Sequence, residues 1–119
     1  MAGIADSLKK LMEVDGSIAC ALVDYNSGMV LGKAGGGIDL DIAGGGNVEV
    51  LKSKMKVMKA LGIPGSIEDI LITLEKQYHI LRPLASKPGL FMYFVLDKAK
   101  SNLGMARYKT GEVETELTV

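Results

Sequence analysis

The sequence predicts an α/β (α+β) domain in which helices cover both faces of a five-stranded antiparallel sheet. Three segments carry apolar residues at helical spacing, and five shorter runs have the composition of strands. Their order along the chain is α-β-β-α-β-β-β-α. Strands that follow one another are joined by connections of hairpin length, and such strands pair antiparallel.

Length and composition favour one domain over residues 1–119, because a chain of 119 residues can bury a core without disulfides or metals. A formal net charge of zero and few aromatic residues argue against nucleic-acid binding. There is one cysteine, and no apolar run approaches the roughly 18 residues of a membrane span. We therefore expect a cytoplasmic protein that does not enter a membrane.

The first part of the chain predicts a helix followed by a β-hairpin. Apolar residues at helical spacing predict a short amphipathic helix over residues 5–14. Residues 17–24 form a nearly continuous apolar run, which is typical of a strand covered on both faces. A turn at 25–28 leads into a partner strand at 29–33, and a glycine-rich loop at 34–37 follows.

The longest helical pattern, residues 39–62, has two apolar faces. One is the expected core stripe: Leu40, Ala43, Leu51, Met55, Met58 and Leu61. Beside it runs a line of small, β-branched and uncharged residues: Ile42, Gly46, Val50, Ser53, Val57 and Ala60. A helix that rests on one sheet needs only one such face. We interpret the second face as a subunit interface; burial of the helix within its own monomer is the alternative.

The glycine triplet at 44–46 complicates this helix. Each glycine inside a helix costs about 0.5–1 kcal/mol relative to alanine. The triplet either allows a close approach of backbones or breaks the segment, with Asn47 then capping a shorter helix. We favour one helix that begins near Asp39.

The second half of the chain predicts three strands and a closing helix. Residues 67–75 alternate, with Ile70, Ile72 and Leu74 on one side. Strands are also predicted at 77–84 and at 90–96, and the latter is the most apolar run and so is placed centrally. From residue 97 the spacing becomes helical, with Asp97 or Ser101 available as the N-cap.

With this order of elements the chain resembles the roadblock/dynein light chain (roadblock/LAMTOR) family. The resemblance covers nearly the whole chain. It rests on the first helix running into Val14-Asp15-Gly16, the strand SIACALVD, the turn and strand YNSGMVLG, and the stretch NLGMAR at 102–107, which is similar to the NLG-x-x-R that opens the family's last helix. The triplet at 44–46 departs from the family pattern and puts the length of the second helix in doubt.

The resemblance implies a profilin-like sandwich and a homodimer. In the family the second helices lie side by side, and the third strands extend the sheet across the interface. Members are mostly non-enzymatic; they serve as platforms for small Ras-like GTPases, or as scaffold and motor-complex subunits. This implied dimer agrees with the two-faced helix that the periodicity alone predicts.

The residues most able to carry chemistry offer little support for an enzyme. Residues 28–34 resemble a phosphate-binding loop only in passing, because Ala34 stands where a Mg²⁺-binding Ser or Thr is needed. The only histidine, His79, is expected on a strand, half exposed, and cannot form a histidine-rich metal site. Cys20 is expected to be an inert core thiol. No cofactor or metal is expected.

Charged residues suggest where a partner could bind. Lys52, Lys56 and Lys59 lie along one arc of the long helix and are either a solvated face or the rim of a partner site. Arg82 and Arg107 are candidates for salt bridges or partner contacts. For either, an arginine finger supplied to a GTPase is the more remote option.

The sequence therefore predicts a non-catalytic homodimer that binds a small Ras-like GTPase or scaffolds a related complex. The alternative is a small-ligand sensor or enzyme with a pocket between sheet and helices. The predicted dimer interface comprises Ile42, Gly46, Val50, Ser53, Val57, Ala60, Ile70, Ile72 and Leu74. The predicted partner-binding residues are Lys52, Lys56, Lys59 and Arg82.

Overall fold

The computed structural model describes residues 2–119 and has the predicted order of elements. The elements are α1 (Ile4–Met12), β1 (Ser17–Asp24), β2 (Val30–Gly35), α2 (Leu40–Leu61), β3 (Ile70–Thr73), β4 (Gln77–Pro83), β5 (Leu90–Asp97), the 3₁₀ helix η1 (Lys98–Lys100) and α3 (Leu103–Glu116). The strands form one antiparallel sheet in the order β2-β1-β5-β4-β3, so the predicted fold class is confirmed.

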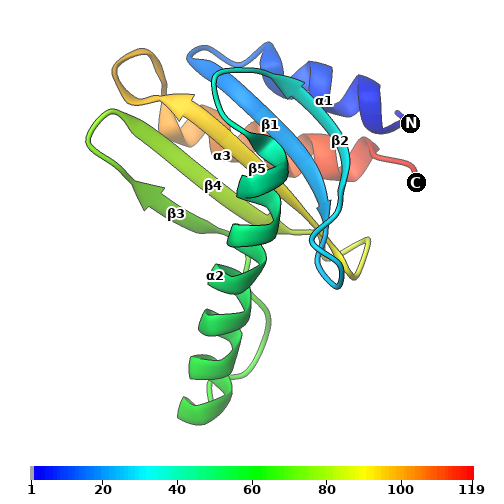
Figure 1. The fold of residues 1–119 in the computed structure, drawn as a ribbon, viewed down its shortest axis with the longest axis vertical. Helices are drawn as coiled ribbons and strands as arrows, with labels where there is room; N and C mark the ends of the chain where they lie inside the picture. The colour runs from blue at the N-terminus through cyan, green and yellow to red at the C-terminus, as the bar shows by residue number, and fades with distance from the viewer. Residues whose placement is uncertain (1) are drawn as a thin grey trace.

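Helices cover both faces of this sheet, as Figure 1 shows. On one face α1 and α3 bury Leu8, Leu11 and Val113 against alternate residues of β1, β4 and β5. On the other face α2 buries Leu40, Val48 and Leu51 against the remaining residues of those strands. Because β5 is the middle strand and is buried on both sides, the central position predicted for this apolar run is confirmed.

Two predicted boundaries on the sheet edges are wrong. Strand β3 covers only Ile70–Thr73, not residues 67–75. Ile70 pairs with Leu81, and two residues further along β4 stands Pro83, which has no N–H to donate. On the other edge, β2 extends through Ala34 and Gly35, which were expected in a loop but pair with β1.

The start of the last helix also differs from the prediction. The segment after β5 first makes the short η1 turn, capped by the Asp97 carboxylate, which accepts a hydrogen bond from the Ala99 N–H. The helix α3 begins only after Asn102, whose side chain accepts from the Met105 N–H. Asn102 is therefore the N-cap in place of Asp97 or Ser101.

Helix α2 is continuous across its glycine triplet. The Asp39 side chain caps it by accepting from the N–H groups of Asp41 and Ile42. An added Cβ on Gly44 would lie 3.0 Å from Cγ2 of Val30, a tight contact, so the glycine favours this close approach of the helix to the sheet. The interpretation of the triplet as a close approach is thus supported at Gly44, and Asn47 does not start a shorter helix.

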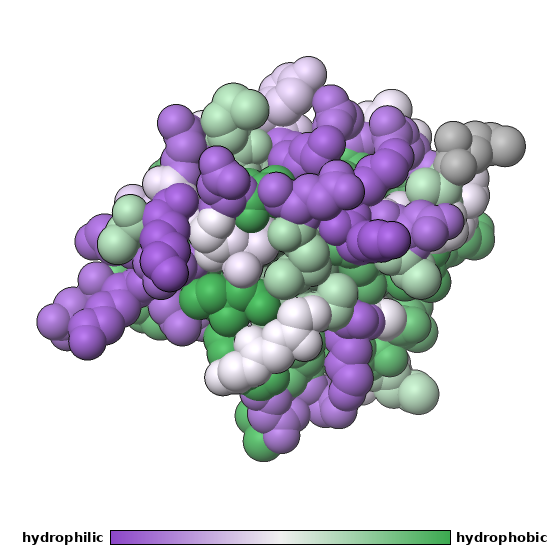
Figure 2. Space-filling model, turned by 90° about the horizontal axis from the view of Figure 1, so that it is seen from above, coloured by the Kyte–Doolittle hydropathy of each residue, from purple (hydrophilic) through white to green (hydrophobic). Residues whose placement is uncertain are grey.

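The surface at the end of the molecule away from the last turns of α2 is mixed: hydrophilic side chains gather in the upper part of the view, and apolar ones in its lower part and along its right side (Figure 2). None of the helices in residues 2–119 combines the length and the apolar character that crossing a membrane requires.

Candidate interaction surface

After Leu51, α2 extends beyond the sheet and has no buried side chain among its remaining residues. Its buried residues, Leu40, Gly44, Val48 and Leu51, all lie in the first twelve positions of the 22-residue helix. Beyond them the helix continues past the end of the sheet, as its lower turns do in Figure 1. A helix of this length spans roughly 33 Å, and the strands beneath it are too short to cover that distance.

The predicted core stripe is therefore only half correct. Leu40 and Leu51 are buried as expected, but Met55 and Leu61 are exposed, the latter by 66% of its surface. These two residues, with Ile63 just beyond the helix, were not assigned to an interface from the sequence. The signal that could have found them is the length of the helical pattern, which exceeds that of every predicted strand.

The second apolar line of α2 is open to solvent along its whole length. Ile42 is 74% exposed and Val57 47% exposed, and Gly46, Val50, Ser53 and Ala60 are exposed as well. The alternative that this line is buried within the monomer is therefore not supported. Its assignment to a dimer interface stays a prediction, because the structure describes a single chain.

Strand β3 is an edge of the sheet and leaves one row of backbone N–H and C=O groups unpaired in this chain. It hydrogen-bonds only to β4. Ile70 and Ile72 pack partly against the core beneath α2, and Leu74, in the turn after the strand, is exposed. An edge of this kind can pair with a strand of another chain.

The exposed arc of α2 is basic. Lys52, Lys56 and Lys59 are exposed, as is Lys54 between them, and no acidic residue occurs from Val50 to Ile67. The Lys52 ammonium lies 5.7 Å from the ring centroid of Tyr25, within the range of a cation–π interaction. The projecting half of α2 thus presents apolar residues beside four lysines.

Arg82 is in an ion pair within the chain. Its Nε donates to the Glu114 carboxylate at 2.9 Å, and the N–H and hydroxyl of Ser86 donate to the same carboxylate. Burial acts to raise the pKa of Glu114, but these hydrogen bonds outweigh it and hold the pKa below its ordinary value. The Arg82 side chain therefore joins β4 to α3, and its predicted role in partner binding stays a prediction.

Arg107 is also in an ion pair, with Asp69. Its Nε and Nη2 donate to the two carboxylate oxygens at 2.8 and 3.0 Å. This bidentate pair connects the first turns of α3 to the residue that precedes β3. Both arginines therefore form salt bridges within the chain, as one of the two interpretations predicted.

His79 and Cys20 occupy the sheet as expected. His79 Nε2 lies 2.8 Å from Oε1 of Gln77, and its Nδ1 lies 2.9 Å from the Tyr93 hydroxyl. A neutral His79 with its proton on Nε2 satisfies both bonds, and burial lowers the pKa of this imidazole. Cys20 is fully buried, and burial raises the pKa of its thiol to about 12.

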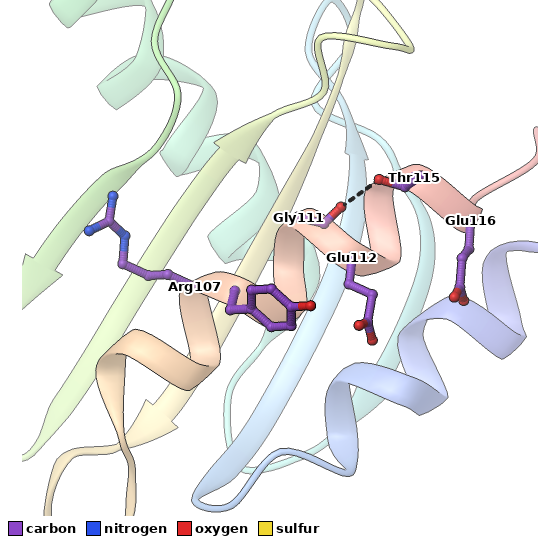
Figure 3. A pocket seen from close by; sticks show the side chains of 6 residues that line it. Arg107, Gly111, Glu112, Thr115 and Glu116 are labelled. Atoms are coloured by element: carbon purple, nitrogen blue, oxygen red, sulfur yellow. Dashed lines mark hydrogen bonds between the residues drawn. The ribbon is translucent and has the colours of Figure 1, made fainter.

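The surface formed by residues 2–119 has several open hollows. One open groove of about 460 Å³ runs along the outer side of α3 (Figure 3), where Glu112 and Glu116 are directed toward α1. Another, of about 410 Å³, lies between Met55 of α2 and the turn joining β4 to β5, and its lining is mainly apolar. Among residues 2–119 no three His, Cys, Asp or Glu side chains are placed to hold a metal.

Comparisons with known proteins identify the fold. No protein-family model matches the sequence, and no curated protein does. Among solved structures, MglB from Myxococcus xanthus superposes with a TM-score of 0.83 at 17% identity, covering 95% of this chain and 89% of that one. A roadblock/LC7 domain from Streptomyces avermitilis gives 0.83 at 10% identity, covering 97% and 94%.

A third solved structure, described as MglB with a tetrameric arrangement, gives a TM-score of 0.82 at 15% identity and covers 95% of this chain and 83% of that one. The class defined by the sheet order and the two helical layers is therefore a small α/β sandwich with one projecting helix and two edge strands, β2 and β3. Within that class the chain has the roadblock/LC7 fold, as its resemblance to the family implied.

Proposed function

We propose that residues 1–119 form a single-domain, non-catalytic interaction module that works as a homodimer in the cytoplasm. The observation that carries this proposal is the large unburied apolar surface of α2, from Ile42 to Leu61, in a chain with the roadblock/LC7 fold. Monomeric proteins rarely expose such a continuous apolar surface, whereas subunit interfaces do. A second copy would bury it.

Two features support a symmetric arrangement of the two copies. The apolar line Ile42, Gly46, Val50, Ser53, Val57 and Ala60 contains small residues, which allow two α2 helices to approach closely. Strand β3, with Ile70, Ile72 and the adjacent Leu74, has a free edge that can pair with the same strand of the partner. A twofold axis that relates the copies can use both features at once.

The function we propose for this dimer is to bind a small Ras-like GTPase, or to scaffold a related complex, by surface complementarity. Support comes from the family resemblance and from the lysines beside the apolar line. In a dimer Lys52, Lys56 and Lys59 would be present twice, next to the shared helices. A surface of this kind is complementary to an acidic patch and affects association rate more than final affinity.

The dimer is tested by placing a charge on the apolar line. Val57→Glu should shift the mass measured by light scattering from two chains to one, because a carboxylate would be forced into an apolar interface. Met105→Glu is the matched control, since Met105 is 60% exposed but lies on α3, on the other face of the sheet. A Val57→Glu protein that keeps the mass of two chains contradicts the interface.

The partner is tested with a Ras-like GTPase from the same genome, loaded in turn with GDP and with a non-hydrolysable GTP analogue. We expect binding that weakens in Lys52→Glu/Lys56→Glu protein and that has an association rate falling steeply with salt. A monomer that binds the GTPase in neither nucleotide state would contradict the proposal and favour the small-ligand alternative.

A further inference from the structure

The segment that joins α2 to β3 is held by side chains rather than by its backbone. The last turn of α2 closes with the Ile63 N–H donating to the Met58 carbonyl. Between that bond and Ile70, the first residue of β3, residues 64–69 make no backbone hydrogen bond to any part of residues 2–119. Both parts of the proposed dimer interface, the end of α2 and the edge strand, are therefore joined by a segment without a hydrogen-bonded backbone.

One bidentate ion pair fixes the last residue of this segment. Asp69 directly precedes β3, and both of its carboxylate oxygens accept hydrogen bonds from Arg107 on α3. In this pair the Asp69 side chain is only 9% exposed, whereas the Arg107 side chain that covers it is 49% exposed. Figure 3 shows the Arg107 side chain reaching away from Glu112 and Glu116, toward the green strand at the edge of the sheet.

The two ends of β3 are thus fixed in different ways. Its C-terminal end is closed by the turn to β4, in which the Leu74 N–H donates to the Gln77 carbonyl. Its N-terminal end has no such turn and is fixed by Asp69. Because β3 has only four residues, displacement of Asp69 would expose much of the strand to fraying.

We infer that Arg107 is a positioning residue for the dimer: by holding Asp69 from the opposite face of the sheet, it fixes the edge of β3 in the conformation that a second copy pairs with. This inference rests on the proposed function, because it requires β3 to be part of the interface. Arg107 itself lies on α3 and need not touch the partner. A preformed edge binds more tightly than one that must become ordered on association.

The test is the dissociation constant of the dimer, measured by sedimentation equilibrium. Arg107→Ala should raise this constant about tenfold, the effect of losing one charge-assisted hydrogen-bond pair. Hydrogen exchange of the β3 amides should accelerate in the same variant while that of β5 does not. Lys109→Ala is the matched control: it removes an ion pair with Glu112 within α3 and should leave the dissociation constant unchanged.

Two further variants separate positioning from a general loss of stability. Asp69→Asn keeps the shape of the side chain and removes its charge, so it should also weaken the dimer. It provides the same test if Arg107→Ala does not fold. The exchange of charges in Asp69→Arg/Arg107→Asp should restore much of the affinity that either single change removes. If the ion pair only stabilised the fold, its removal would lower the unfolding free energy of the monomer and leave the dissociation constant of the dimer unchanged.

The outcomes distinguish this inference from the function on which it rests. Wild-type protein that is monomeric at every concentration overturns the proposed dimer and, with it, the role of Arg107. Wild-type protein that dimerises while Arg107→Ala and Asp69→Asn dimerise equally well overturns only the inference.

Discussion

Glu114 shows how single residues hold the two layers together. The carboxylate is buried, which by itself disfavours its charge, yet it accepts hydrogen bonds from Arg82 and from Ser86. Its pKa is consequently lowered below the ordinary value of 4.5. A carboxylate with a depressed pKa in the folded state stabilises the fold above its unfolded pKa, and this contribution is lost as the pH falls through the folded value.

Replacing this carboxylate should therefore have a pH-dependent cost. We expect Glu114→Gln to lower the unfolding free energy by about 2 kcal/mol at pH 7, because the Arg82 guanidinium is left without its charged partner. The difference from wild type should shrink as the pH falls from 4.5 through the lower pKa of the carboxylate in the folded protein, where Glu114 becomes protonated. Urea denaturation at both pH values measures this. Glu112→Gln, which alters a half-exposed pair on the same helix, should have a smaller effect.

Cys20 gives a second prediction at this scale. Because its thiol is buried and its pKa is raised to about 12, the native protein should not react with a disulfide reagent at pH 8. Protein unfolded in guanidinium chloride should react fully within the same time. Rapid labelling under native conditions would show that β1 opens more readily than its position between β2 and β5 suggests.

At the scale of elements, α2 illustrates what the sequence could and could not predict. Apolar spacing, the Asp39 cap and the Gly62 stop define the helix, and all three are local signals. The depth to which the helix is buried is not local, since it depends on how far the sheet extends beneath it. Met55 and Leu61 fit the core stripe by spacing, but both side chains are exposed.

The same contrast applies to strand boundaries and to the ion pairs. Alternation suggested that the strand begins at residue 67, whereas its pairing with β4 begins only at Ile70, which lies opposite Leu81, two residues before Pro83. The partners of Arg82 and Arg107 are 32 and 38 positions away along the chain. Spacing gives no information about such pairs, so both arginines were candidates without an assigned partner.

The glycines of α2 allow a test of how closely this helix packs. Gly45→Ala should stabilise the fold by about 0.5–1 kcal/mol, because an added methyl meets no atom of the chain within 4 Å and alanine favours the helix. Gly44→Ala should gain less than this or destabilise, since its methyl would press on Val30 and Val23. Thermal unfolding of the two variants measures the difference. Equal stabilisation by both would mean that the helix can move away from the sheet without cost.

For the whole molecule, the main feature is that α2 is longer than the part of the sheet that it covers. The two helices on one face, α1 and α3, pack on the strands that they cover, while α2 projects past the sheet and has no buried residue after Leu51. The free edge of β3 lies at the side of the sheet opposite to β2. Both features are satisfied together if a second copy of the chain supplies the missing surface.

The mass of the wild-type protein in solution tests this most directly. In sedimentation equilibrium over a wide range of concentrations we expect a species of twice the 12.6 kDa chain mass, dissociating only on dilution. A mass of 12.6 kDa at every concentration, with the amides of the second half of α2 protected from hydrogen exchange in that single chain, would contradict the account.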